Sequence, residues 1–179
     1  MKYTLLLLLS VFLISSCTDI DKTNRLSKID KMVHGLDSIS AQLKKEKIDT
    51  LAEMQLAAQG VEYRIRGNFV ADTIDLELGK KMDGYKRMRR AIPKLRSNIV
   101  KLEKGIIELR KSLTSLKKDI ENNSGARGKY DEYIKFEKNK FDQIVILFKE
   151  FQKNQTKISD TYSVLHVELY NFSMQLIAK

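Results

Sequence analysis

A run of apolar side chains at alternating spacings of three and four residues constrains this fold more than any other feature. The run continues without a fault over four heptads, through Ile92, Leu95, Ile99, Leu102, Ile106, Leu109, Leu113, Leu116 and Ile120. An α-helix brings residues at this spacing onto one face, and a seam sustained over several heptads is typical of coiled coils. The pattern therefore predicts a long helix that packs along one side against a neighbouring helix.

A second seam of the same kind lies nearer the carboxyl terminus, with Gln155 as its one polar member. Its residues are Phe141, Ile144, Phe148, Phe151, Gln155, Ile158, Tyr162, Leu165, Leu169, Phe172 and Leu176. Asparagines and glycines in the intervening segment, 122–128, adopt the left-handed conformations that end helices. Because this loop is short, we expect helices at 73–121 and 129–178 to fold back on one another as an antiparallel hairpin.

The amino-terminal part of the helical region has two shorter seams that are shifted by one residue. The shift falls near 47–50, so we expect a helix over 23–66 with a kink or short break there. Residues 60–78 also contain alternating apolar and polar positions, for which a small β-hairpin is the other interpretation. If this segment is a turn instead, Asp72 or Thr73 would cap the next helix.

The predicted fold class is all-α, an elongated antiparallel three-helix bundle or coiled-coil hairpin. The composition agrees, because the chain has 31% charged residues, one proline and no tryptophan, which is typical of long helices. Val164, Val167 and Met174 lie off the second seam. We expect them to complete the core of the bundle, with a contact to a second copy of the chain as the other interpretation.

The first seventeen residues have the three parts of a secretory signal. Lys2 precedes apolar runs over 5–9 and 11–14, and small residues precede Cys17. The apolar core has only about ten residues, whereas a membrane-spanning helix needs ~20. The segment therefore predicts a cleaved signal peptide rather than a retained transmembrane helix.

The four residues Ile14-Ser15-Ser16-Cys17 resemble the lipobox of bacterial lipoproteins. The resemblance implies removal of a signal peptide over 1–16, attachment of lipid such as palmitate at Cys17, a lipidated tether over 17–22 and a helical coiled-coil domain over 23–179. More than one acyl chain gives stable anchoring, since each buried methylene contributes about 0.8 kcal/mol. Thr18 in place of aspartate favours the outer over the inner membrane.

Positive charge is concentrated on the second predicted helix. Fourteen Lys and Arg lie between Lys80 and Lys118, against three Asp and Glu, in a chain with a net charge of +10. Outside the cytoplasm we expect such a surface to meet an anionic wall polymer or an acidic protein and not nucleic acid. The candidate binding residues are Lys86, Arg87, Arg89, Arg90, Lys94 and Arg96. The other interpretation is a solvated face that neighbouring carboxylates neutralise, such as Asp131, Glu132 and Glu137.

The sequence contains no recognisable catalytic or metal-binding pattern. His34 and His166 are the only histidines, and they lie on different predicted helices without further ligands at metal-binding spacing. The segment Gly125 to Lys129 lacks the spacing of a phosphate loop. Acylation of Cys17, the single cysteine, would leave no thiol for a disulfide or for catalysis. We therefore expect neither enzymatic activity nor a metal or cofactor.

Three short segments resemble the Asp-Ser/Thr-aliphatic pattern of O-glycosylation sites in bacterial envelope proteins. They make Ser38, Thr50 and Thr73 candidate O-glycosylation residues.

Taken together, these patterns predict a lipid-anchored envelope protein with a structural, scaffolding or binding role. Its helical part resembles cell-wall-binding coiled-coil lipoproteins in architecture alone. An accessory subunit that packs through an apolar helix stripe, or an immunity or inhibitor lipoprotein, would have the same features.

Overall fold

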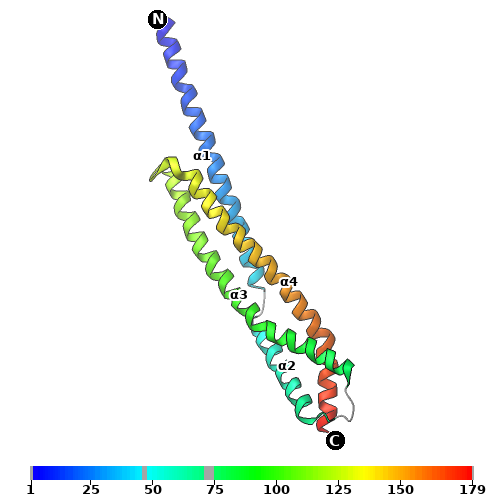
Figure 1. Ribbon diagram of the computed structural model, residues 1–179. Helices are drawn as coiled ribbons and strands as arrows, with labels where there is room; N and C mark the ends of the chain where they lie inside the picture. The colour runs from blue at the N-terminus through cyan, green and yellow to red at the C-terminus, as the bar shows by residue number, and fades with distance from the viewer. Residues whose placement is uncertain (1, 46–47, 71–74, 179) are drawn as a thin grey trace. The chain divides into compact units, whose positions relative to one another are not determined.

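The protein is an assembly of α-helices (Figure 1). The computed structural model describes the backbone of residues 2–45, 48–70 and 75–178, and the side chains of residues 20–45, 49–70 and 75–178. Within these ranges no strand is present. The α-helices are α1 (Lys2–Leu43), α2 (Ile48–Asn68), α3 (Leu76–Glu121) and α4 (Tyr130–Ile177), and a 3-10 turn, η1 (Arg127–Lys129), precedes α4. The predicted all-α class is confirmed.

The helix predicted over 23–66 is divided in the structure. Its first part belongs to α1 and its second part is α2, with Lys44 and Lys45 in a turn between them. The division falls where the apolar seams shift by one residue, because a straight helix would direct its two seams to different sides. The β-hairpin interpretation of 60–78 is wrong for the described residues, since α2 continues to Asn68 and α3 begins at Leu76.

The chain forms two compact units, and each unit contains parts of three helices. Unit 1 consists of Met1–Gln42 and Glu103–Val145, so it contains α1, the later part of α3 and the beginning of α4. Unit 2 consists of Leu43–Leu102 and Ile146–Lys179, which contain α2, the beginning of α3 and the later part of α4.

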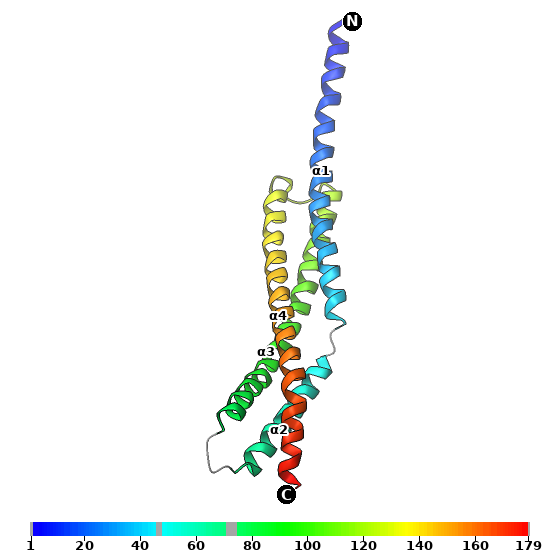
Figure 2. The same cartoon turned by 90° about the vertical axis from the view of Figure 1, so that its right-hand side faces the viewer.

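The three helical segments of unit 1 lie side by side (Figures 1 and 2). Ion pairs and one close contact between a glycine and an aromatic ring join them. Lys117 of α3 pairs with Asp30 of α1 at 2.6 Å, and Arg25 of α1 pairs with Asp131 of α4 at 2.6 Å. Gly35 of α1 faces α4 so closely that a Cβ atom there would lie 2.5 Å from Cζ of Phe141. The absent side chain is what lets α1 and α4 approach at this point.

The predicted seams form the cores of the two units. All nine residues of the α3 seam are buried, together with Tyr85 and Met88 before it. On α4 the most buried members of the seam are Ile144, Phe148, Phe151, Ile158 and Leu169. Burial of these side chains removes apolar surface from water at roughly 25 cal/mol per Å², which is the main stabilising contribution to such packing.

The α3–α4 loop in unit 1 confirms the conformations expected of its asparagines and glycines. Asn123 has a φ of +52° and Gly125 a φ of +74°, both in the left-handed region. The Tyr130 hydroxyl donates a hydrogen bond of 2.9 Å to the carbonyl oxygen of Asp119, which ties the start of α4 to the end of α3.

At the other end of α3 the helix cap differs from the prediction. The Leu78 N–H donates a hydrogen bond of 2.9 Å to Oδ1 of Asp75, so Asp75 caps the helix in place of Asp72 or Thr73. Asp72 and Thr73 lie outside the described residues.

An aromatic cluster joins α3 and α4 in unit 2. The buried Tyr85 hydroxyl of α3 is hydrogen-bonded to Nδ1 of His166 on α4, and the His166 ring stacks on Tyr162 with 4.3 Å between centroids. Burial lowers the pKa of His166, and the nearby charge of Arg64 from α2 lowers it further. Burial also raises the pKa of Tyr85. The neutral imidazole is therefore the form that this cluster accommodates.

Candidate functional site

The six residues of the predicted anion-binding cluster all lie on α3 in unit 2, but they do not form one patch. Arg89 is turned inward, toward α2. Its Nε and Nη2 atoms donate hydrogen bonds of 2.7 and 3.2 Å to the two carboxylate oxygens of Glu62, whose side chain is only 5% exposed. The hydrogen bonds raise the pKa of Arg89. Arg89 thus compensates a buried carboxylate and is not available to an external anion.

Two further arginines of the cluster are exposed. Arg87 shares a helix face with Arg90 and Lys94 but is engaged by an acidic neighbour, whereas Arg96 lies on another side of α3. Arg87 pairs with Asp83, one turn earlier on α3. Such a pair on an exposed helix surface contributes only about 0.3–0.5 kcal/mol, so an external anion could displace Asp83. Arg96 is exposed and, seven residues after Arg89, lies on the same side of the helix as Arg89.

The basic stripe is a set of cations on one face of α3 for which no ion pair is found among the described side chains. It consists of Lys86, Arg90, Lys94 and Lys101, whose spacings of four, four and seven residues place them on one helix face. Arg90, Lys94 and Lys101 are exposed and Lys86 is half-buried. None of the four forms an ion pair with any side chain that the structure describes. The segment 84–102 contains seven Lys and Arg and no Asp or Glu.

Lys101 was not among the predicted binding residues, and its spacing of seven residues after Lys94 is the signal that identifies it. Conversely, the carboxylates proposed to neutralise the cluster have other environments. Asp131 pairs with Arg25, and Glu137 pairs with Lys140 and accepts a hydrogen bond from Ser112, all within unit 1.

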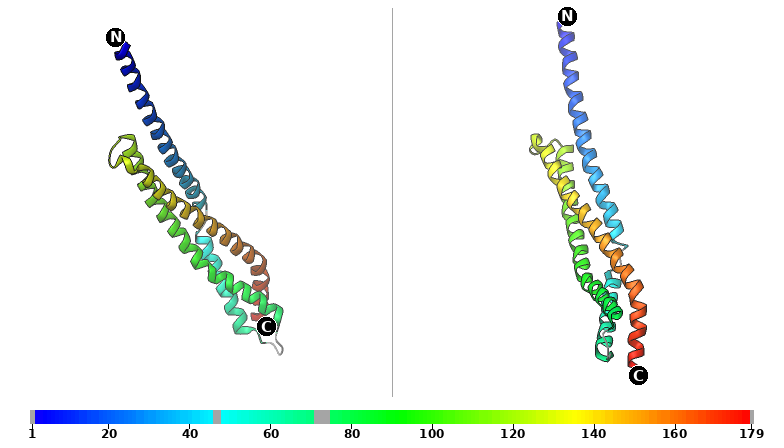
Figure 3. Two further views of the ribbon diagram at one scale, coloured as in Figure 1. Left: turned by 45° about the horizontal axis from the view of Figure 1, so that its top comes forward. Right: turned by 45° about the vertical axis from the view of Figure 1, so that its right-hand side comes forward.

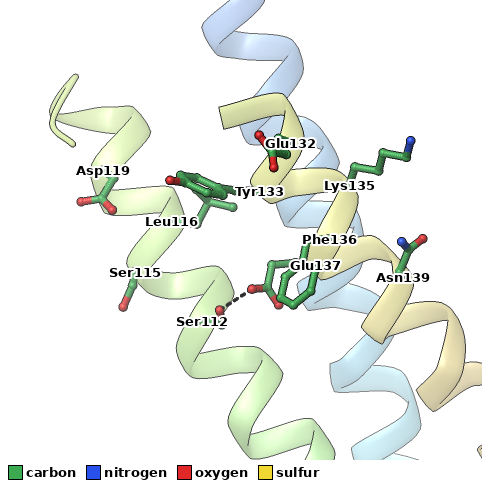
Figure 4. A pocket seen from close by; sticks show the side chains of 10 residues that line it. All are labelled: Ser112, Ser115, Leu116, Asp119, Glu132, Tyr133, Lys135, Phe136, Glu137 and Asn139. Atoms are coloured by element: carbon green, nitrogen blue, oxygen red, sulfur yellow. Dashed lines mark hydrogen bonds between the residues drawn. The ribbon is translucent and has the colours of Figure 1, made fainter. Parts of the chain in front are cut away.

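A groove between α3 and α4 in unit 1 has a different character, and the sequence did not point to it. We call it the acidic groove; its volume is about 640 Å³. Figure 4 shows its lining residues, which come from both helices. From α3 they are Ser112, Ser115, Leu116 and Asp119, and from α4 they are Glu132, Tyr133, Lys135, Phe136, Glu137 and Asn139. Tyr133 is directed toward α3, whereas Lys135 points away from it (Figure 4).

Glu137 is the most buried charged group of the acidic groove. Its side chain is 9% exposed, and Oε1 accepts a hydrogen bond of 2.6 Å from the Ser112 hydroxyl. Lys140 Nζ lies 3.2 Å from Oε2 and donates a hydrogen bond of 3.3 Å to Oε1, yet Oε2 has no hydrogen-bond partner among the described residues. The same Nζ lies 4.3 Å from the centroid of the Phe136 ring. Two exposed aromatic rings, Tyr133 and Phe136, complete the apolar lining.

An exposed apolar stripe on α4 in unit 2 corrects a sequence-based expectation. Val164 and Val167 are 69% and 62% exposed, and Met174 is exposed as well, so these side chains do not complete the core. These three side chains lie on one face of α4. The apolar stripe consists of Val164, Val167, Tyr170, Met174 and Ile177.

The predicted modification sites are described only in part. Ser38 on α1 and Thr50 on α2 are exposed, whereas Thr73 lies outside the described residues. The side chain of Cys17 also lies outside them, although the backbone there belongs to α1. The amino-terminal part of α1 continues beyond the α3–α4 loop of unit 1 in every view (Figures 1 to 3).

Among the described residues, no group of three or more acidic, histidine or cysteine side chains is placed to hold a metal ion. None of the described helices is long and apolar enough to cross a membrane. No family model, curated protein or solved structure matches the chain.

Proposed function

We propose that this protein is a lipid-anchored scaffolding or binding component of a bacterial cell envelope, and that its basic stripe binds an anionic wall polymer or an acidic partner. The observation that carries the binding role is the set of unpaired cations on one face of α3. The lipobox resemblance at Cys17 supports the anchor and the signal peptide, and Thr18 supports the outer membrane.

The spacing of the basic stripe suits an extended polyanion. Lys86 and Lys101 are fifteen residues apart, which corresponds to about 22 Å along a helix that rises 1.5 Å per residue. Flexible ammonium groups on one line can follow phosphate or carboxylate groups without a deep pocket, since the attraction is electrostatic. We infer that an antiparallel three-helix coiled-coil arrangement presents this face.

The binding proposal is tested with purified bacterial cell-wall material and with polyphosphate as a soluble polyanion. The stripe variant replaces Lys86, Arg90, Lys94 and Lys101 with glutamine, and none of these side chains forms an ion pair with a side chain that the structure describes. The matched control replaces Lys118, Lys129, Lys149 and Lys153, four other exposed lysines, and therefore loses the same charge. Co-sedimentation at low salt should be lost in the stripe variant and retained in the control. Retention by both variants would refute a role for the stripe.

The anchor is tested by replacing Cys17 with serine. The unchanged chain should fractionate with membranes, and mass spectrometry should find its mature amino terminus at residue 17 with acyl groups attached. The Cys17→Ser chain should lose both the acyl groups and the membrane association. An unmodified Cys17 in the native chain would refute the lipoprotein assignment.

A second candidate function is an accessory subunit of an envelope complex, which the apolar stripe on α4 favours. Its side chains repeat at helical spacing, so the matching occupant is an amphipathic helix of a partner protein. Val167→Lys should abolish cross-linking to one stoichiometric partner in intact cells, while the stripe variant should leave that cross-link intact. If the partner were lost from the stripe variant but still cross-linked to the Val167→Lys variant, the binding role of the basic stripe would be favoured instead.

A further inference from the structure

We propose that the acidic groove of unit 1 is a binding site for a small organic ligand that carries a protonated amine on an apolar body. The ammonium group would bind Glu137, and the apolar body would lie on Tyr133, Phe136 and Leu116. This site is separate from the basic stripe in residues and in the charge of its ligand.

The first argument is that one oxygen of the buried Glu137 carboxylate accepts no hydrogen bond from a described residue. Glu137 is nine-tenths buried, and its Oε1 is held by the Ser112 hydroxyl at 2.6 Å. Oε2 is buried and forms no hydrogen bond with a described residue. A buried acceptor that lacks a hydrogen bond is costly, and a donor that reaches it with good geometry recovers part of that cost. The Ser112 bond (Figure 4) fixes the carboxylate between α3 and α4.

The second argument is that the site already accommodates an ammonium group. Lys140 Nζ lies 4.3 Å from the Phe136 centroid and 3.2 Å from Glu137 Oε2. This position combines a cation–π contact with charge attraction, the two interactions by which aromatic sites recognise amines. The Lys140 side chain is 43% exposed and comes from the next turn of the same helix. It is therefore partly open to solvent, and a ligand amine would compete with it for the same position.

The third argument is the charge and size of the groove. Asp119, Glu132 and Glu137 line it, and the one lysine in the lining, Lys135, points away from α3 (Figure 4). A volume of about 640 Å³ falls within the usual range for small-molecule sites, roughly 300–1,000 Å³. An acidic, aromatic groove of this size favours a cationic ligand even in a chain whose net charge is +10.

The test uses three probes that share a phenyl group on a four-carbon chain and end in a cationic, a neutral or an anionic polar group: 4-phenylbutylamine, 4-phenylbutanol and 4-phenylbutyrate. Each is titrated into the isotopically labelled full chain, and binding is followed by amide chemical shifts. The amine should shift residues 112–119 and 132–139 and bind about tenfold more tightly than the alcohol, because its hydrogen bond to Glu137 is charge-assisted. The anion should not bind. Equal affinities for amine and alcohol, or no shifts at millimolar amine, would overturn the proposal.

Three variants separate the site from general electrostatics. Glu137→Gln keeps the shape of the side chain and should weaken amine binding about tenfold. Glu150→Gln removes one charge from an exposed position elsewhere on α4 and should leave it unchanged. Lys140→Met removes the internal competitor and should tighten binding several-fold. Weaker amine binding by the Lys140→Met variant would contradict the proposal that Lys140 competes with the ligand amine. Lys140 is half-buried, and Glu137 keeps its Ser112 hydrogen bond in that variant, so Lys140→Met tests the site even if Glu137→Gln does not fold.

Discussion

Two neighbouring arginines on α3, Arg89 and Arg90, have opposite surroundings. Arg89 forms two hydrogen bonds with the buried Glu62 of α2, while Arg90 is exposed and has no ion pair among the described side chains. From composition alone, both arginines would be assigned to the same anion-binding cluster. A test of anion binding that neutralises Arg89 would therefore confuse loss of binding with loss of stability.

The first prediction follows from this difference. Arg89→Ala removes both hydrogen bonds from the buried Glu62 carboxylate and leaves only Arg66, whose Nη2 lies 3.7 Å from Oε2. The free energy of unfolding should therefore fall by about 3 kcal/mol. Arg90→Ala should change it by less than about 0.5 kcal/mol, as is usual for exposed substitutions. Urea denaturation followed by circular dichroism measures both. The double variant Glu62→Leu with Arg89→Met should recover most of the loss, and no recovery would show that the cost is not one of unpaired charge.

The second prediction concerns the buried imidazole of unit 2. Burial and Arg64 lower the pKa of His166 below its ordinary value of about 6.5. The unfolded chain therefore binds a proton first as the pH falls. The stability contribution of neutral His166 should be complete above pH 6.5 and should be lost as the pH falls through the lower, folded-state pKa. Its neighbours are Tyr85, Tyr162 and Tyr170, with Arg64 the nearby charge.

The measurement is urea denaturation at a series of pH values between 8 and 5. Asparagine at position 166 keeps an acceptor near the position of Nδ1 for the Tyr85 hydroxyl and does not titrate. The His166→Asn chain should therefore lack the decrease that the native chain shows below pH 6.5. The same decrease in both chains would assign it to other groups.

At the scale of the elements, the apolar seams predict what is buried but not how closely two helices approach. The α3 seam could be read directly from the sequence because its spacing is a property of the single helix. Gly35 gave no such signal, since the steric demand at that position comes from Phe141, more than one hundred residues later. The sequence indicated the division of α1 from α2 only through the one-residue shift between the two apolar seams.

The third prediction compares two helical glycines. Alanine raises helix propensity by up to about 1 kcal/mol over glycine, and at Gly60 of α2 the added Cβ would only meet Nη1 of Arg64 at 3.5 Å. Gly60→Ala should therefore stabilise the protein. At Gly35 the Cβ would lie 2.5 and 2.7 Å from atoms of the Phe141 ring. Overpacking costs about 1–3 kcal/mol, so Gly35→Ala should be destabilising by about 1 kcal/mol.

Thermal and urea unfolding of the two variants provide the comparison. Adding Phe141→Leu to Gly35→Ala should restore part of the stability, because the smaller side chain leaves room for the Cβ. Stabilisation by Gly35→Ala alone would show that the Phe141 ring moves aside without cost.

At the scale of the whole molecule, the fold class could be predicted from local periodicity, whereas the sites depend on pairing between segments that are distant in the sequence. The excess of positive charge on α3 was evident from composition. Which cations remain unpaired depends on partners such as Glu62 on α2, and the acidic groove exists because Ser112 of α3 faces Glu137 of α4. These pairings depend on how far each helix is shifted along its neighbour, and a single sequence does not reveal that register.

The last prediction uses salt to distinguish a local stripe from net charge. The stripe variant and the matched control each lose four positive charges, so an effect of overall charge would weaken polyphosphate binding equally in both. Screening acts over about 10 Å at 0.1 M salt, and an anion held by several aligned cations loses affinity steeply as salt increases. Between 50 and 300 mM salt, the native chain and the control should therefore show the same steep loss, and the stripe variant a weak, nearly flat dependence. Parallel, equally reduced slopes for the two variants would mean that the anion responds to the charge of the whole chain and that α3 has no special role.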